Sequence, residues 1–241
     1  MVANSASGYS LTQLSGALDA PKSSLFPILQ TMRVKHFLRY SEKEQIYKIG
    51  PAAFQVGMSF VNKTNIMESV EREMDWIVKQ CLETVHFAIL DNGNVVYLIK
   101  KDSPRFVRMM STVGLLLPAY GTGIGKALLI DKNIDQLKEL YPNGLKALTG
   151  NTITDFKKLH EQLLQFRRDD ISYEYEESNA DIRCIGAALR RGGSVVSALS
   201  IAAPIFRCSD KDIEKYRAVL LESKKRLEVF FQDIQFDLAL Q

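Results

Sequence analysis

Apolar residues recur at helical spacing near the start of the chain and predict two short helices. The first helix begins with a capping box in which Ser10 is followed three positions later by Gln13. The second begins near Pro21 and carries apolar residues at i, i+3, i+4 and i+7 counted from Leu25. Residues 37–49 then place two short apolar runs around a charged turn, as expected of a two-stranded hairpin. This order predicts a winged helix-turn-helix unit.

The pattern changes after residue 50 and indicates a second, larger unit of mixed α/β (α+β) class. A connecting helix is expected over residues 52–63, and a helical stripe follows over residues 66–81. Asn92-Gly93 between two apolar runs is a strong signal for a hairpin turn. Further strands are expected over residues 106–111, 171–175, 184–189 and 195–203, with a turn over residues 190–193. Further helices are expected over residues 134–140, over residues 156–166 and after Ser209.

The segment 117–130 brings glycines, a lysine and the beginning of a helix together. Glycines at alternate positions from 121 to 125 allow a close approach of the backbone, and a helix beginning there would direct free N–H groups outward to a small anion. Tyr120 and Ala127 exclude a Walker loop, and Lys126 occupies the position of the third glycine of a dinucleotide fingerprint. Two interpretations remain, a small-anion site and a helix that packs closely on a sheet.

Composition limits the class of protein. A chain of 241 residues with 46% hydrophobic residues can form one small and one medium domain, and no stretch is long and apolar enough to span a bilayer. Three scattered cysteines and three scattered histidines suit a reducing cytoplasm and give no reason to expect a disulfide framework, a metal or a cofactor.

Charge is distributed unevenly along the chain. Residues 1–64 hold seven Lys and Arg against three Asp and Glu, a net of +4, whereas the whole chain carries +3. A basic unit joined to a nearly neutral body is typical of a nucleic-acid-binding protein.

Five motifs follow one another along the chain. They are Lys22-Ser-Ser24, Tyr47-Lys-Ile-Gly50, Leu117-Pro-Ala-Tyr-Gly-Thr-Gly-Ile-Gly-Lys126, Tyr173 to Glu177 followed by Ile182-Arg-Cys184, and Leu199-Ser-Ile201 with Pro204. None is decisive alone. In this order and spacing, from about Leu11 to Phe231, the chain resembles the IclR family of bacterial transcription regulators.

The resemblance implies three parts. They are a winged helix-turn-helix DNA-binding domain over residues 1–50, a linker helix over residues 51–65, and a GAF-like domain over residues 66–241 that binds a small organic acid as effector. By position, Gly123 and Ile124 would offer backbone amides to the carboxylate of the effector. The wall of the pocket would consist of Glu174, Ile182, Cys184, Ser200 and Ala202. For the cysteine, simple packing is the alternative.

The chain departs from the family pattern at three places. Ala202 stands where a second Ser is often found, so the effector is expected to be less polar or differently oriented. Pro27 stands in the recognition helix where an Arg is common, and a kink costing ~3 kcal/mol is expected there. The family places a further helix before the one at Leu11, so this helix is expected to be missing here, which counts against specific DNA binding.

The function that follows is a cytoplasmic, ligand-responsive regulator that binds a double-stranded operator as a homodimer or homotetramer. The residues expected to contact DNA are Lys22, Ser23, Ser24 and Phe26 at bases and Arg33, Lys35, Arg39, Lys43 and Lys48 at phosphates. Two alternatives remain open, a small-acid sensor without specific DNA binding and an enzyme that uses Cys184 as nucleophile. No Gly-x-Ser-x-Gly elbow occurs and no histidine is in a recognisable pairing with Cys184, so no catalytic residue is expected.

Overall fold

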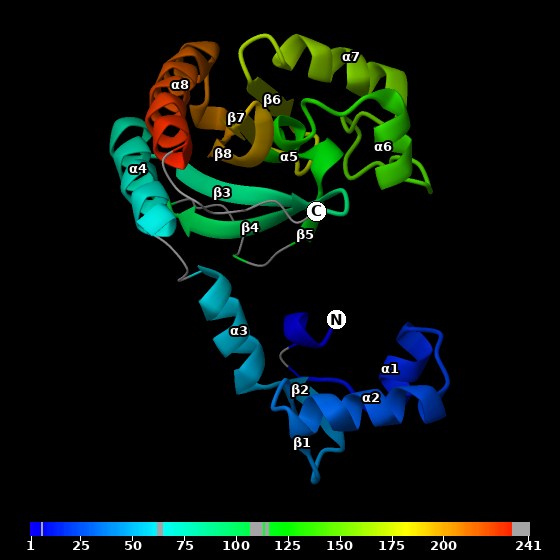
Figure 1. Cartoon of the computed structure of the whole chain (residues 1–241). Helices are drawn as coiled ribbons and strands as arrows, with labels where there is room; N and C mark the ends of the chain where they lie inside the picture. Colours follow the sequence, from blue (N-terminus) through cyan, green and yellow to red (C-terminus); the bar gives the residue numbers. More distant parts are fainter. Residues whose placement is uncertain (6, 62–64, 107–112, 114–115, 233–241) are drawn as a thin grey trace. The chain divides into compact units, whose positions relative to one another are not determined.

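The computed structural model describes residues 1–5, 7–61, 65–106, 113 and 116–232, and the chain divides into two units. The first unit spans Met1–Thr64 and the second Asn65–Gln241 (Figure 1). The strand expected over residues 106–111 lies, except for its first residue, outside the described residues, as does the end of the connecting helix at 62–63.

The first unit is a winged helix-turn-helix. Its elements are η1 (Val2–Asn4), α1 (Leu11–Ala17), α2 (Lys22–Val34), β1 (Leu38–Ser41), β2 (Ile46–Ile49) and α3 (Pro51–Val61). The predicted capping box is present, with Gln13 N donating to Ser10 Oγ at 3.2 Å and Ser10 N donating to Gln13 Oε1 at 2.8 Å. Leu14 and Leu29 of the helices pack with Leu38 of the hairpin in one small core. Of the stripe predicted for the second helix, Leu25 and Leu29 face this core, whereas Ile28 and Met32 are exposed.

The second helix contains a proline in its interior. α2 begins one residue after Pro21 and continues through Pro27, so Pro27 does not end it. A proline at this position has no N–H to donate to the carbonyl of Ser23, four residues earlier. The hydroxyl of Thr31 donates to the carbonyl of Pro27 at 2.9 Å. The proline is exposed, and its ring therefore forms part of the helix surface.

The second unit is built on a six-stranded antiparallel sheet in the order β5-β4-β3-β8-β7-β6. The strands are β3 (Thr84–Asp91), β4 (Asn94–Lys101), β5 (Leu116–Pro118), β6 (Ile171–Tyr175), β7 (Ile182–Arg191) and β8 (Ser194–Pro204). The helices are α4 (Asn65–Cys81), α5 (Gly123–Leu128), α6 (Ile134–Leu140), α7 (Phe156–Phe166) and α8 (Asp210–Gln232), with short 3-10 turns η2 (Ala119–Gly121) and η3 (Ile205–Arg207). The predicted mixed α/β class is confirmed. Among the described helices, none is both long and apolar enough to cross a bilayer.

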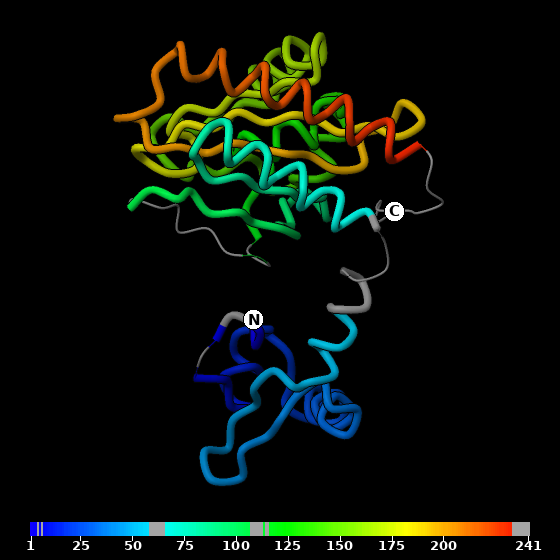
Figure 2. Tube along the Cα trace, turned by 90° about the vertical axis from the view of Figure 1, so that its left-hand side faces the viewer, coloured from blue at the N-terminus to red at the C-terminus, as the bar shows by residue number. Residues whose placement is uncertain are grey.

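Helices cover both faces of this sheet. α4 and α8 lie side by side along one face, where they bury Met74 and Leu220 (Figures 1 and 2). α5 lies on the other face, and the core there continues into α6 and α7 through Leu137 and Leu159. Because both faces are buried, the central strands read as nearly continuous apolar runs in the sequence.

Two tight turns set the register of the sheet. Asn92-Gly93 has φ of 45° and 78°, which is the backbone geometry of a two-residue hairpin, and this predicted turn is confirmed. Gly192-Gly193 has φ of 56° and 86° and joins β7 to β8. The turn predicted over residues 190–193 was therefore too long. Arg190 belongs to β7, where its guanidinium pairs with Asp170 at 2.7 Å.

We expect Gly125→Ala to destabilise the second unit. A Cβ added at Gly125 would lie 2.2 Å from Ala119 O and 2.4 Å from Ala119 Cα. Backbone atoms move aside only at a cost, so the free energy of unfolding should fall by about 1–3 kcal/mol or more. Gly150→Ala is the matched control, because nothing lies within 4 Å of its Cβ position. Chemical denaturation of both variants checks this, and equal stabilities would contradict the packing described.

Candidate functional site

The expected wall residues lie on one face of the sheet. The strand register places Glu174 opposite Cys184, and Cys184 opposite Ala202. Ser200 and Ile182 each lie two residues along a strand from a member of this row, and side chains two residues apart share a face. The structure therefore brings together five residues from three strands.

The glycine segment covers this face at backbone contact distance. A Cβ added at Gly123 would lie 2.8 Å from Cys184 Sγ, so a side chain has no room there. Gly186 of β7 faces the same segment, and its Cβ would lie 2.8 Å from Gly123 O. Ser172 Oγ donates to Gly123 O at 2.6 Å. Two facing glycines and one hydroxyl thus fix α5 on the sheet.

The beginning of α5 is buried, which corrects the expectation that its N–H groups are directed outward. All six residues of the helix are buried, because it lies between the sheet and the core formed with α6 and α7. Thr122 Oγ1 accepts from Gly125 N at 3.0 Å, and the Ile124 N–H is directed at Cys184 Sγ. The Gly123 N–H has no acceptor among the described residues.

Burial holds a thiol and an imidazole on this face in their neutral forms. Burial raises the pKa of the Cys184 thiol, and the nearby Glu174 raises it further, so the thiolate is disfavoured. His86 lies opposite Ser200 in the ladder, and burial lowers its pKa to about 4. Ser200 Oγ is buried without a hydrogen-bond partner among the described residues, although it is close enough to the thiol to oppose part of the pKa rise.

A buried ion pair lies beside this face. Lys126 of α5 is 0% exposed, and its Nζ pairs with the carboxylate of Glu177, which is 6% exposed. Burial lowers the pKa of Lys126, and the nearby Glu177 opposes that change. Removing one partner of a buried pair leaves an uncompensated charge, which typically costs about 3–5 kcal/mol. The pair therefore ties α5 to the chain that follows β6.

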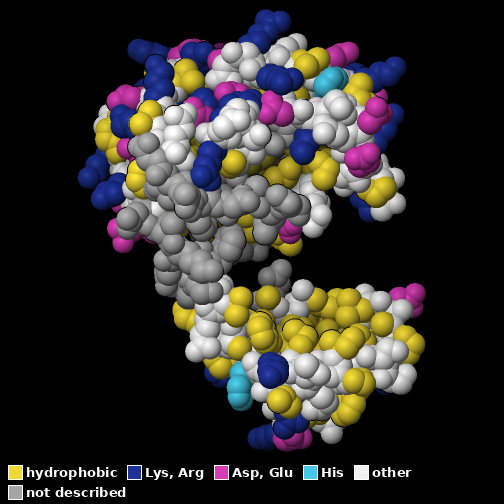
Figure 3. All heavy atoms as spheres, in the orientation of Figure 1, with side chains coloured by type: hydrophobic (Ala, Val, Ile, Leu, Met, Phe, Trp, Pro, Cys, Tyr) yellow, Lys and Arg dark blue, Asp and Glu magenta, His cyan; other side chains and the backbone are white. Residues whose placement is uncertain are grey.

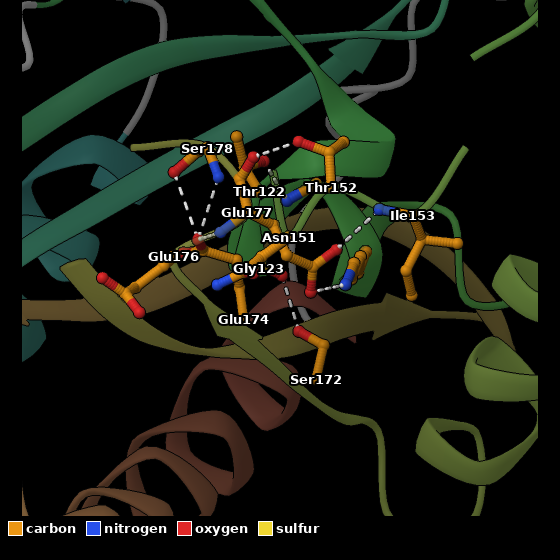
Figure 4. A network of polar contacts seen from close by, with 12 residues as sticks. Thr122, Gly123, Asn151, Thr152, Ile153, Ser172, Glu174, Glu176, Glu177 and Ser178 are labelled. Carbon is orange, nitrogen blue, oxygen red and sulfur yellow. Dashed lines mark hydrogen bonds and ion pairs between the residues drawn. The ribbon is translucent and has the colours of Figure 1, made fainter. Parts of the chain in front are cut away.

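The turn after β6 holds the Glu174 carboxylate (Figure 4). The N–H groups of Glu177 and Ser178 donate to Glu174 Oε1 at 2.6 and 3.0 Å. Thr152 Oγ1 donates to Glu177 O at 2.7 Å and holds the turn from the other side. The position of the Glu174 carboxylate thus depends on backbone amides that Lys126 and Thr152 keep in place.

Glu174 is the carboxyl group of this face that titrates near neutral pH. Burial raises its pKa to about 7, against the opposing effects of the Ser178 and Glu177 N–H groups and of Lys126. A protonated carboxyl donates one hydrogen bond, whereas an ionised one only accepts. Glu174 can therefore serve as a donor or as an acceptor within the physiological range.

Glu174 and Glu177 also line a pocket of about 340 Å³ at the edge of the sheet, together with Tyr173 and Arg183. Arg183 is already paired with Asp210 at 2.7 Å. The positive charge in this pocket is therefore locally compensated.

Sequence analysis did not identify Lys126, Glu177 or Ser172 as parts of this arrangement. Ser172 could have been found, because it alternates with Glu174 on the same strand. Lys126 belongs to the glycine segment and to the motif that ends with it, but no local pattern indicates that a lysine will be buried. Within the described ranges, no group of three His, Cys, Asp or Glu side chains is placed to hold a metal ion.

The residues expected to contact DNA all lie in the first unit. Arg33 pairs with Glu42 at 3.0 Å, and Lys48 pairs with Glu44 at 3.4 Å, both on the surface. Exposed pairs of this kind contribute about 0–1 kcal/mol, so either cation can exchange its partner for a phosphate. The other expected cations make no ion pair with a described residue; they are Lys22, Lys35, Arg39 and Lys43. Ser23, Ser24 and Phe26 are exposed.

Comparison with known proteins assigns both the fold and the family. The family model described as "Bacterial transcriptional regulator IclR C-terminal" matches residues 58–228. The HTH-type transcriptional regulator KdgR of Escherichia coli (strain K12) is 29% identical over 90% of this chain and 83% of its own length. The HTH-type transcriptional repressor AllR of Salmonella typhimurium is 30% identical over 83% of this chain and 75% of its own length.

A solved structure shares the fold. It is an IclR homolog from Microbacterium hydrocarbonoxydans complexed with 4-hydroxybenzoate, which is 17% identical, covers 92% of this chain and 90% of its own, and superposes with a TM-score of 0.73.

We expect Glu174→Gln to change how stability depends on pH. The unfolded chain releases this proton near pH 4.5 and the folded unit only near pH 7, so the free energy of unfolding falls as pH rises between these values. The variant should lack this fall. Between pH 5 and pH 8 its free energy of unfolding should therefore decrease by less than that of the native chain, with a difference on the order of 3 kcal/mol. Urea unfolding at both pH values checks it, with Glu214→Gln as an exposed control. Parallel pH profiles for Glu174→Gln and the native chain would contradict the expected titration.

Proposed function

The chain belongs to the IclR family of bacterial transcription regulators, and on that premise we propose how its parts act. It is a ligand-responsive transcription regulator. We propose that residues 1–50 bind operator DNA, that residues 51–65 link the two functions, and that residues 66–241 bind a small organic acid.

Two unsatisfied polar groups carry the proposal for the effector site. The buried Ser200 hydroxyl and the Gly123 N–H have no hydrogen-bond partners among the described residues. Buried polar groups are normally hydrogen-bonded, so such groups on one face favour a ligand that accepts hydrogen bonds there. A carboxylate suits an amide at the beginning of a helix together with a hydroxyl.

The rest of the wall narrows the class of acid. Ile182 and Ala202 offer no hydrogen bond, which favours a small monocarboxylate with an apolar body over a polyhydroxy acid. Glu174 in its protonated form would donate to this ligand, whereas its ionised form would repel the carboxylate. The IclR homolog complexed with 4-hydroxybenzoate makes that aromatic acid the first probe for this chain.

The first unit supports binding to double-stranded DNA. Its net charge of +4 and its four cations without a described ion-pair partner suit phosphate contacts, while the exposed beginning of α2 suits the major groove. We propose that the chain acts in the cytoplasm as a homodimer or homotetramer, because two copies would place two α2 helices on the two halves of an operator.

The effector changes DNA binding only if its affinity differs between two states of the protein. AllR is named a repressor, and we propose the same direction here, with the acid favouring the state of lower operator affinity.

We propose no catalytic role for the chain. The raised pKa of Cys184 disfavours the thiolate that a nucleophile would need, and the relatives are named as regulators. A sensor that binds the acid without specific DNA binding is the remaining alternative.

Ser200→Ala should weaken binding of 4-hydroxybenzoate about three- to tenfold, because one hydrogen bond to the carboxylate is lost. The free energy of unfolding should not fall, since the hydroxyl has no partner among the described residues. Ser197→Ala is the matched control: its hydroxyl is also buried without a described partner, but it lies on the opposite face. Calorimetric titration at pH 6 measures both affinities. Equal losses in the two variants would contradict this site.

Lys43→Ala should weaken binding to all duplexes alike and reduce the magnitude of the slope of log affinity against log salt by about one, because one phosphate contact is lost.

Glu44→Gln should tighten binding to all duplexes, because it frees Lys48 from its ion pair. Fluorescence anisotropy across salt concentrations, on the duplex upstream of the gene and on random duplex, measures both. An unchanged slope for Lys43→Ala would argue against the wing as a DNA contact.

A further inference from the structure

The surface of α2 presents two exposed rings. Leu25 and Leu29 pack against the core of the first unit. Successive residues of a helix are separated by about 100°, so Pro27 points in the opposite direction, away from that core. Phe26 is 48% exposed, and Pro27 is exposed beside it.

Phe26 lies on the flank of α2 that faces the wing. Phe26, Gln30 and Arg33 are spaced i, i+4 and i+7, so they share one stripe of the helix. Arg33 reaches Glu42 in the turn between β1 and β2 at 3.0 Å. Ile28 lies on the other flank. A duplex that touches both α2 and the basic residues of the wing would therefore cover Phe26 and Pro27 but not Ile28.

The chemistry of this surface is unusual for the reading of bases. Between Ser23 and Ile28 the helix carries no Arg, Lys, Asn or Gln, which are the side chains that hydrogen-bond to the edges of guanine and adenine; those nearest to Phe26 are Lys22 and Gln30, one turn away on either side. The apolar feature of the major groove is the C5-methyl group of thymine. Phe26 and Pro27 are placed to contact it without hydrogen bonds.

The surrounding charge favours DNA over a protein partner. Hydrophobic side chains gather on one face of the first unit, as Figure 3 shows. The cations without a described ion-pair partner are on the same small unit, at Lys22 in the first turn of α2 and at Arg39 and Lys43 in the wing. Rings next to such cations suit a groove bordered by phosphates.

We infer that Phe26 and Pro27 read thymine methyl groups in the major groove, so that each half-site contains thymines where α2 enters. The inference rests on the proposed DNA binding and adds the base preference to it. Each methyl group buried on a ring contributes about as much as one buried CH₂, which corresponds to about a fourfold change in affinity.

The test uses the full chain and a duplex library with a randomised core. Selection should enrich thymines at fixed positions. Each selected thymine is then replaced by uracil, which pairs identically but lacks the methyl group. We expect the native chain to lose affinity about fourfold for each methyl that it contacts.

Three variants assign the effect to residues. Phe26→Ala and Pro27→Ala should each bind the thymine and uracil duplexes with nearly equal affinity at one position. Ile28→Ala, which alters an exposed apolar residue on the other flank, should keep the native preference. Pro27→Arg should shift the selected base at its position to guanine, because Arg hydrogen-bonds to O6 and N7 of guanine.

The outcomes separate this inference from the proposed function. Selective binding that tolerates uracil at every position would overturn the thymine reading and leave the regulator intact. Binding without any selected sequence would overturn both. If Phe26→Ala leaves base preference unchanged but lowers the molecular mass measured by analytical ultracentrifugation, the rings form a contact between protein chains and the inference is wrong.

Discussion

The geometry of the second unit depends on one buried contact, the ion pair between Lys126 and Glu177. An ammonium group in a packed interior is tolerated only with a partner, so the chain after β6 must bring its carboxylate to α5. The same turn offers its amides to Glu174, and Thr152 holds it from outside. The position of the titrating carboxyl is thereby tied to the helix that begins at Gly123.

The close approach of α5 to the sheet brings the Gly123 backbone onto the strand residues Cys184 and Gly186, and Gly186 lies opposite Ser200. Glycines at 123 and 186 remove the side chains that would separate helix and strand. Burial keeps His86 neutral and the Cys184 thiol protonated, so the face offers hydrogen bonds rather than full charges. The Glu174 carboxyl on this face changes its charge near neutral pH, because burial raises its pKa to about 7. Gain or loss of one proton at Glu174 therefore changes the charge of this face.

The ion pairs of the first unit are exposed, in contrast to the buried pair of Lys126 and Glu177 in the second unit. The exposed pairs are weak, as between Arg33 and Glu42, so the cations of the first unit can be redistributed to a partner at little cost. Its core is small, and exposed rings such as Phe26 remain on its surface. Apolar and basic groups together suit the major groove of DNA, which is bordered by phosphates and contains the methyl groups of thymine.

Local patterns in the sequence were sufficient for most elements of the fold. The capping box at Ser10, the Asn92-Gly93 turn and the amphipathic spacing of α7 depend on neighbouring residues, so the sequence alone determined them. The expected site residues were reached by resemblance, and their common face follows from the period of two along paired strands. The burial of Lys126 and the inward beginning of α5 were decided only by tertiary structure. Both depend on contacts between residues about fifty positions apart, and no local spacing encodes which distant groups will meet.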